Sequence, residues 1–167
     1  MKKIRISLIS ALACLLMAVP AQSKDALVEL KVMTLDTALK LAEAALASCR
    51  NSGYQVAVAV VDRMGTTQVV LKDRYAGPHT PETARRKAWT AVSFRADTLA
   101  LAELTASGSP QAGVRHVTDA LMVGGGVPVE AAGSIVGGVG ISGAPGGAED
   151  DACARAGIDA VIADLEM

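Results

Sequence analysis

The sequence predicts an α/β protein in which helices flank a mainly antiparallel sheet of five strands. One observation is a pair of short β-branched segments, residues 55–62 and 67–73, separated by a glycine-containing turn. A second is a series of three short strand-like segments between residues 120 and 142. A third is the helical spacing of three longer segments, which lie before the β-branched pair, between that pair and the later series, and after the series. Short connections between consecutive strands favour antiparallel pairing.

The first helix is predicted from Thr34 to about Asn51. Thr34 is a good N-cap residue because its hydroxyl can accept a backbone N–H of the first turn. Gly53 provides a stop, since glycine readily adopts the left-handed conformation that ends many helices. The apolar residues between these limits recur at helical spacing: Leu35, Ala38, Leu39, Ala42, Ala45 and Leu46.

The second helix is predicted to begin at Thr80 and to continue to about residue 96. Thr80 provides a hydroxyl for the N-cap, and Pro81 suits the first helical position. A stripe of small residues, Ala84, Ala88 and Ala91, would let this helix lie close to a sheet. A further short helical segment is expected over residues 98–105, and residues 107–113 are expected to be irregular.

Eight of the sixteen glycines of the chain lie between residues 124 and 143. The triple glycine that begins at Gly124 is interpreted as a turn between two short strands, residues 120–123 and 129–132. In the next strand, residues 134–142, glycine alternates with valine and isoleucine, so one face is nearly bare. Such a face can accept a packed helix, a neighbouring subunit or a flat ligand. A closing helix is expected over residues 149–165.

Residues 1–23 are predicted to be a signal peptide. Lys2, Lys3 and Arg5 precede an apolar stretch over residues 6–19, and small residues around Ala21 offer a cleavage site. The apolar stretch is too short for a good membrane anchor. Cleavage after Ser23 would leave one domain, residues 24–167, and would place the protein in the periplasm or outside the cell.

The charge of this domain argues against nucleic acid as a partner. Residues 24–167 contain 13 basic and 17 acidic residues, a net charge of −4 with neutral histidine, whereas phosphate contacts need a basic face. Two cysteines remain, Cys49 and Cys153. In an exported protein they can form a disulfide, and the alternative is two buried free thiols. Neither has the C-x-x-C spacing of metal or thioredoxin-like sites.

The order of several motifs resembles that of the GlcG/HbpS-like (DUF336) family. The similarity spans nearly all of residues 24–167. The segments that match are 60–65 (VVDRMG), 74–78 (RYAGP), 84–91 (ARRKAWTA), 124–128 (GGGVP), 137–144 (GGVGISGA) and 150–157 (DDACARAG).

The resemblance implies a profilin-like sandwich and a tendency to form homo-oligomers. The best-known members are extracellular heme-binding proteins, some of them reported to degrade heme. Others are a glycolate-operon accessory protein and a domain attached to corrinoid adenosyltransferases. The E-x-x-E iron-binding motif of one branch is absent from this sequence, which argues against iron sensing.

His79 is the first candidate for a metal ligand, because only His79 and His116 offer an imidazole. His79 lies on a short loop beside the N-terminus of the second helix, where backbone N–H groups attract carboxylates. Arg74 could add a cationic clamp, and the Thr80 hydroxyl is the next oxygen ligand to consider. The alternative for His79 is an exposed loop histidine, and for His116 a histidine at the surface or at an interface.

Lys87 is a candidate for binding a carboxylate, since it lies in the family's K-A-x-T-A motif. The alternative is a salt bridge to Asp62 or another acid. Asp62 is expected to stabilise the turn that follows it, and Thr90 to bond the backbone. The sequence contains no Ser-His-Asp order, H-E-x-x-H or phosphate loop, so no catalytic residue is assigned and an enzymatic role stays open.

Three functional hypotheses follow from these residues and the resemblance. The first is an exported protein that binds heme or another tetrapyrrole through His79 or His116, in a partly exposed site or between subunits against the glycine-rich strand. The second is an accessory protein or enzyme acting on a small carboxylated metabolite of the glycolate type. The third is a structural oligomeric module. Only the first predicts a Soret band when hemin is added.

Overall fold

The computed structural model describes residues 26–166. The predicted signal peptide therefore lies outside the described residues. The chain divides into two compact units, and residues 26–30 of the first unit are exposed and have no regular secondary structure. The fold below is that of the second unit, which begins at Lys31. Within residues 26–166, no helix combines the length and the apolar character needed to cross a bilayer.

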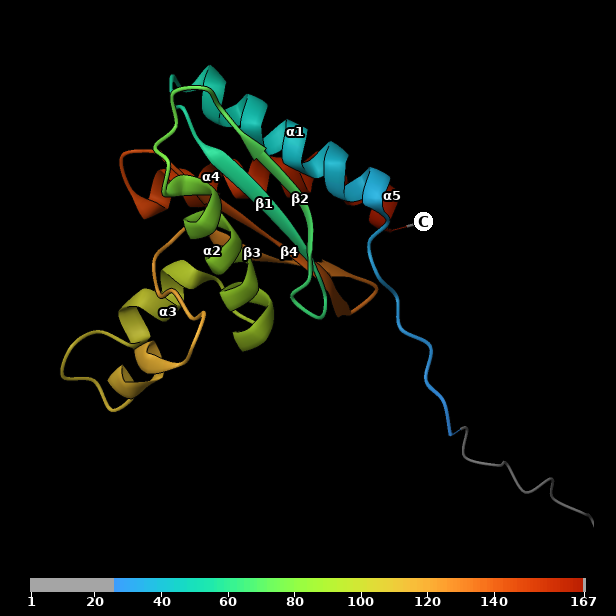
Figure 1. The fold of residues 1–167 in the computed structure, drawn as a ribbon. Helices are drawn as coiled ribbons and strands as arrows, with labels where there is room; N and C mark the ends of the chain where they lie inside the picture. The colour runs from blue at the N-terminus through green and yellow to red at the C-terminus, as the bar shows by residue number, and fades with distance from the viewer. Residues whose placement is uncertain (1–25, 167) are drawn as a thin grey trace, which may run out of the picture. The chain divides into compact units, whose positions relative to one another are not determined.

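The centre of the fold is an antiparallel sheet of four strands in the order β2-β1-β4-β3 (Figure 1). The strands are β1 (Ala57–Asp62), β2 (Thr67–Lys72), β3 (Gly126–Ala131) and β4 (Ser134–Ser142). The antiparallel pairing is confirmed, but the expectation of five strands is wrong.

The missing strand is the segment over residues 120–123. The backbone N–H of Leu121 donates to Thr90 Oγ1 at 2.8 Å, and Val123 N donates to Leu121 O within a tight turn. Because these bonds direct the segment to the second helix and to itself, it forms no ladder with a strand. The triple glycine is therefore not a turn between two strands.

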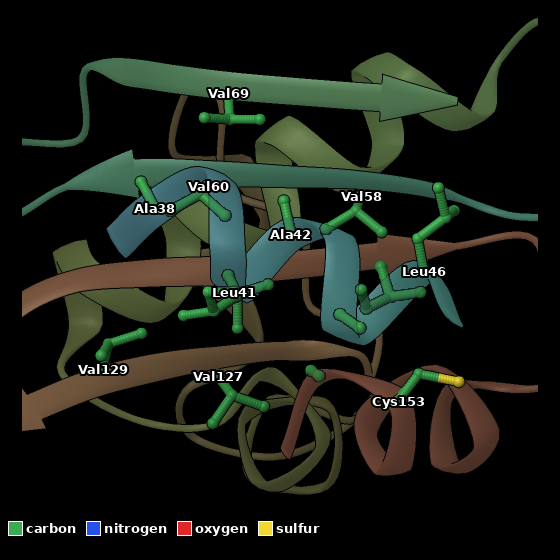
Figure 2. Close-up of a cluster of buried hydrophobic side chains, with 14 of the residues drawn as sticks. Ala38, Leu41, Ala42, Leu46, Val58, Val60, Val69, Val127, Val129 and Cys153 are labelled. Carbon is green, nitrogen blue, oxygen red and sulfur yellow. The ribbon is translucent and has the colours of Figure 1, made fainter. Parts of the chain in front are cut away.

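Helices cover both faces of the sheet. On one face lie α1 (Leu35–Asn51) and α4 (Gly147–Asp159), and on the other lies α2 (Thr80–Phe94). The main core lies between the sheet and the first pair, where Ala38 and Ala42 of α1 belong to one cluster of buried side chains with Val58 and Val60 of β1 (Figure 2). The short helices are α3 (Thr98–Leu104), the 3-10 helix η1 (Ala112–His116) and α5 (Ile162–Leu165).

The bare face of β4 is covered by α2. A Cβ added at Gly140 would overlap the Ala84 carbonyl oxygen of α2, and one at Gly138 would lie 3.1 Å from the Ala88 oxygen. Small residues on both sides therefore let the backbones of helix and strand meet. Of the three occupants that the sequence allowed, the packed helix is present. A heme or a neighbouring subunit cannot lie against this face without displacing α2.

Two helix boundaries differ from the expectation. Thr34 caps α1 as predicted, because its hydroxyl accepts the Thr37 N–H at 3.2 Å. Thr80 does not cap α2, since its hydroxyl donates to the Gly77 carbonyl at 2.8 Å. The closing helix is interrupted after Asp159, where Val161 N donates to Ile158 O and the Val161 side chain enters the core.

A disulfide joins α1 to α4. The Cα atoms of Cys49 and Cys153 lie 5.5 Å apart, within the range for a bridge, and both side chains are buried. Of the two alternatives for the cysteines, the structure shows the disulfide. The bridge closes a long stretch of chain, because the cysteines are 104 residues apart in sequence.

Candidate functional site

An open cleft of about 620 Å³ lies where the N-terminal ends of α2 and α4 approach each other. Its walls come from the loop after α1, the loop before α2 and the loop from β4 into α4. It is lined by Gly53, Tyr54, Gln55, Tyr75, Gly77, His79, Thr80, Thr83, Lys87, Val123, Asp150 and residues 142–147. Three of the predicted site residues, His79, Thr80 and Lys87, are thus brought to one cleft.

A buried ion pair forms part of the cleft lining. Lys87 Nζ donates to Asp150 Oδ2 at 2.7 Å and to the Ile141 carbonyl at 2.9 Å, and Lys87 is only 2% exposed. Asp150 Oδ1 accepts the Ala144 N–H at 3.1 Å. Burial raises the pKa of the Asp150 carboxyl above its ordinary value, although Lys87 and the Ala144 N–H act in the opposite direction.

This pair settles how Lys87 is held. The sequence allowed a salt bridge to Asp62 or another acid, and the partner is Asp150. Asp62 instead accepts the N–H groups of Met64 and Thr66 and so stabilises the β1–β2 turn, as expected. Thr90 also bonds the backbone as expected, donating to Arg86 O at 2.7 Å.

The triple glycine packs directly against this ion pair. A Cβ on Gly125 would lie 2.5 Å from Asp150 Cβ and 3.1 Å from Lys87 Nζ, and Gly125 has a φ of +107°. Both the space and the backbone angle therefore require glycine here. The triple glycine is therefore a segment whose backbone lies close to the side chains of Lys87 and Asp150. The sequence spacing alone could not distinguish this role from that of a turn.

His79 presents its imidazole from the residue just before α2. The ring packs over Gly77, where an added Cβ would lie 2.7 Å from His79 Cε1. Among the described residues the ring makes no hydrogen bond, and the side chain is exposed. A ring that is placed by packing and has no bonded partner is suited to bind a ligand that enters the cleft.

The cleft also contains both tyrosines of the chain, Tyr54 and Tyr75. Tyr75 is 80% exposed and Val123 is 44% exposed, so apolar surface faces solvent at the rim. Sequence reasoning did not select these residues. The signal that could have found them is the position of Tyr75 four residues before His79 on the same loop.

The electrostatics of the cleft favour an anionic group. Lining residues come from the start of α2 and from the start of α4, including Thr80, Thr83 and Gly147. Each helix N-terminus carries a partial positive charge and unsatisfied N–H groups. The two ends act on the same space, whereas the charge of Lys87 in the lining is balanced by Asp150.

Two predicted site residues lie elsewhere. Arg74 is exposed and does not line the cleft, although it precedes Tyr75 on the same loop. His116 is an exposed residue at the end of η1, also outside the cleft. Within residues 26–166, no group of three or more His, Cys, Asp or Glu side chains could hold a metal ion.

The chain belongs to the family described as "Haem degrading protein HbpS-like", whose model matches residues 33–159. The match extends from just before α1 to the end of α4, so it includes every element that builds the cleft. A search of curated proteins found no match.

Solved structures of similar proteins support the same assignment. A double mutant of Streptomyces reticuli HbpS, with two glutamates changed to aspartate, is 40% identical, with a TM-score of 0.76 over 85% of this chain and 96% of that one. Klebsiella pneumoniae protein ORFY, a DUF336 protein, is 25% identical with a TM-score of 0.80 over 83% and 97%. A PduOC:heme complex is 29% identical with a TM-score of 0.73 over 77% and 94%.

Proposed function

We propose that this protein binds heme in the cleft between the starts of α2 and α4, where His79 would hold its iron. The observation that carries the proposal is the meeting of His79, whose imidazole has no bonded partner among the described residues, with Tyr54 and Tyr75 in one open cleft. A related protein solved as a heme complex and the family description support the choice of ligand.

The residues present fit a heme. The macrocycle supplies four nitrogens to its iron, so the protein needs to add only one or two axial ligands. One histidine is therefore sufficient, and a multi-residue metal cluster is not required. The cleft volume of about 620 Å³ lies within the range of cofactor and ligand sites, roughly 300–1,000 Å³. Its openness would leave one edge of the heme in solvent.

Each group in the cleft has a role in this proposal. The aromatic ring of Tyr75 offers a face for stacking on the planar macrocycle. The starts of α2 and α4 attract the propionate carboxylates, and the ion pair of Lys87 with Asp150 forms part of the lining beside them. Thr80 belongs to the lining on α2, where its hydroxyl donates to Gly77 O. Arg74 and His116 would contribute only from outside the cleft. When bound, heme would supply redox-active iron; heme degradation is a second step that this proposal does not assign to any residue.

A hemin titration tests the proposal. Addition of hemin to the protein should produce a saturable Soret band with a fixed stoichiometry. The second hypothesis, binding of a small carboxylate such as glycolate, draws on the same two helix N-termini. It predicts thermal stabilisation by carboxylates and no specific Soret band. A structural module would show neither response, and that result would contradict both ligand hypotheses.

Export completes the proposal. Cleavage near Ser23 would deliver a mature chain beginning near Lys24 to the periplasm or the exterior, where the Cys49–Cys153 disulfide is stable. Intact mass of the exported protein checks this, and an uncleaved chain would contradict it. A homo-oligomer is also proposed, but the glycine-rich strand cannot supply its interface because α2 covers that strand.

A further inference from the structure

The segment just before α1 has the residue pattern of a β-strand, but it pairs with no strand of the described residues. Val28, Leu30 and Val32 alternate with Glu29 and Lys31, which is the period of a strand with one apolar face. We call these five residues the arm. The arm has no regular secondary structure, and its apolar side chains are 81%, 53% and 56% exposed. Exposed apolar side chains in this pattern indicate a surface that a partner covers.

The sheet has a free edge that could receive a strand. Among residues 26–166, β2 pairs only with β1, and no backbone group of residues 67–72 makes a hydrogen bond beyond that ladder. The other edge strand, β3, has Pro128 near its middle, and proline cannot donate to a ladder. The β2 edge is therefore the better acceptor of an added strand.

An apolar flank of α1 lies beside the same edge. α1 packs over β1 and β2, whereas α4 packs over β4 and β3. The side of α1 that faces α4 carries Leu41 and Ala45, which approach Gly157 of α4. Leu35 and Leu39, one helical turn apart, lie on the opposite flank toward the outside of β2. They are 58% and 39% exposed.

We propose that the arm of one copy of this chain adds as a fifth strand to the β2 edge of a second copy. Its apolar residues would then lie on the α1 face, next to Val69 of β2, and would cover Leu35 and Leu39. Glu29 would lie on the opposite face, the α2 face, which carries exposed Lys72. A cross-strand pair of opposite charge is available there.

The position of Met33 favours a second copy over the chain's own sheet. Met33 N donates to Val136 O of β4 at 3.4 Å, and β1 separates β4 from β2. Because neighbouring strands lie about 4.8 Å apart, an arm that returned to its own β2 would use much of its length crossing the sheet. Exchange between two copies is reciprocal and closes as a symmetric pair.

Light scattering and hydrogen exchange test this proposal on the protein as cells produce it. Intact mass spectrometry first identifies the residue at which the mature chain begins. The parent should have at least the mass of a dimer at micromolar concentration. The amides of residues 28–32 should exchange at least tenfold more slowly than in an unstructured peptide. Leu30→Asp in the arm and Leu39→Asp on the α1 flank should each shift the protein to monomer and remove that protection.

The matched control is Lys31→Gln, which changes the side chain on the solvent-facing side of the arm that has no proposed partner, and it should keep the parent's mass. Unchanged far-UV circular dichroism shows that each variant is folded. A monomeric parent overturns the proposal, and a monomer with protected arm amides shows that the arm folds onto its own sheet. An oligomer with unprotected arm amides, or one that persists in both aspartate variants, also overturns it.

Discussion

Lys87 Nζ lies 2.7 Å from Asp150 Oδ2, and this bond links the second turn of α2 to the first turn of α4 at the lining of the cleft. Both side chains are almost completely buried. Their position between two helix starts, with Gly125 packed against them, makes the pair a fixed support for the site. It also makes the stability of the protein sensitive to pH.

Replacement of Lys87 by methionine should destabilise the protein by about 3–5 kcal/mol at neutral pH, because it leaves a buried carboxylate without its partner. Burial already raises the pKa of Asp150 above the ordinary value of 3.8, and loss of the ammonium should raise it further. The folded chain then holds this proton more tightly than the unfolded chain. Stability should therefore fall as pH rises from 3.8 through the folded-state pKa.

Denaturant unfolding between pH 4 and pH 7 measures this effect. The free energy of unfolding should fall more steeply with pH in Lys87→Met than in the parent. The double variant Lys87→Met with Asp150→Asn removes the titrating group and should lose the added slope. Equal slopes in the parent and in Lys87→Met would show that Asp150 does not carry the effect.

The disulfide should contribute substantially to stability. Replacement of both Cys49 and Cys153 by alanine should lower the free energy of unfolding by about 2–5 kcal/mol, because the bridge constrains a long loop in the unfolded chain. Chemical denaturation of the double variant and of the reduced parent should give similar midpoints. A variant as stable as the oxidised parent would show that the bridge adds no stability.

Gly140→Ala should destabilise the fold by about 1–3 kcal/mol, since the new methyl group meets the backbone of α2. Gly113→Ala is the matched control, because an added Cβ there meets nothing within 4 Å. Thermal unfolding of the two variants measures the difference. If both variants have the melting temperature of the parent, the close contact between β4 and α2 does not exclude a larger side chain at residue 140.

Tyr75→Ala should weaken hemin binding by about twofold to tenfold if its ring stacks on the macrocycle, an aromatic contact of roughly 0.5–1.5 kcal/mol. Tyr75→Phe keeps the ring and should retain most of the affinity. Because Tyr75 is 80% exposed, neither change should alter thermal stability in the absence of hemin. Equal hemin affinity in the parent and in Tyr75→Ala would show that Tyr75 does not contribute to heme binding.

Local patterns predicted most of the fold. Thr34 and the helical spacing of α1, the β1–β2 hairpin and the small-residue stripe of α2 are each determined by neighbouring residues. The strand expected over residues 120–123 failed because its backbone bonds a side chain that is distant in sequence, Thr90. The interruption of the closing helix between Asp159 and Ile162 likewise depends on tertiary packing, because the Val161 side chain is buried in the core.

The candidate site could be predicted only in part. His79, Thr80 and Lys87 were selected from local chemistry, and they do line one cleft. The partner of Lys87 could not be found, because Asp150 is 63 residues away and no local spacing connects them. Arg74 was selected because it precedes His79 by five residues, and His116 because it offers the other imidazole. Nothing in the sequence showed that they would lie outside the cleft.

The most direct test is hemin affinity, measured by absorbance, for His79→Ala and His116→Ala beside the parent. Loss of an axial ligand should weaken binding at least about tenfold in His79→Ala, or ~1.4 kcal/mol, and should shift the Soret maximum. His116→Ala should bind like the parent, and far-UV circular dichroism should be unchanged in both. If the two single variants and the double variant all bind hemin like the parent, ligation through His79 is contradicted.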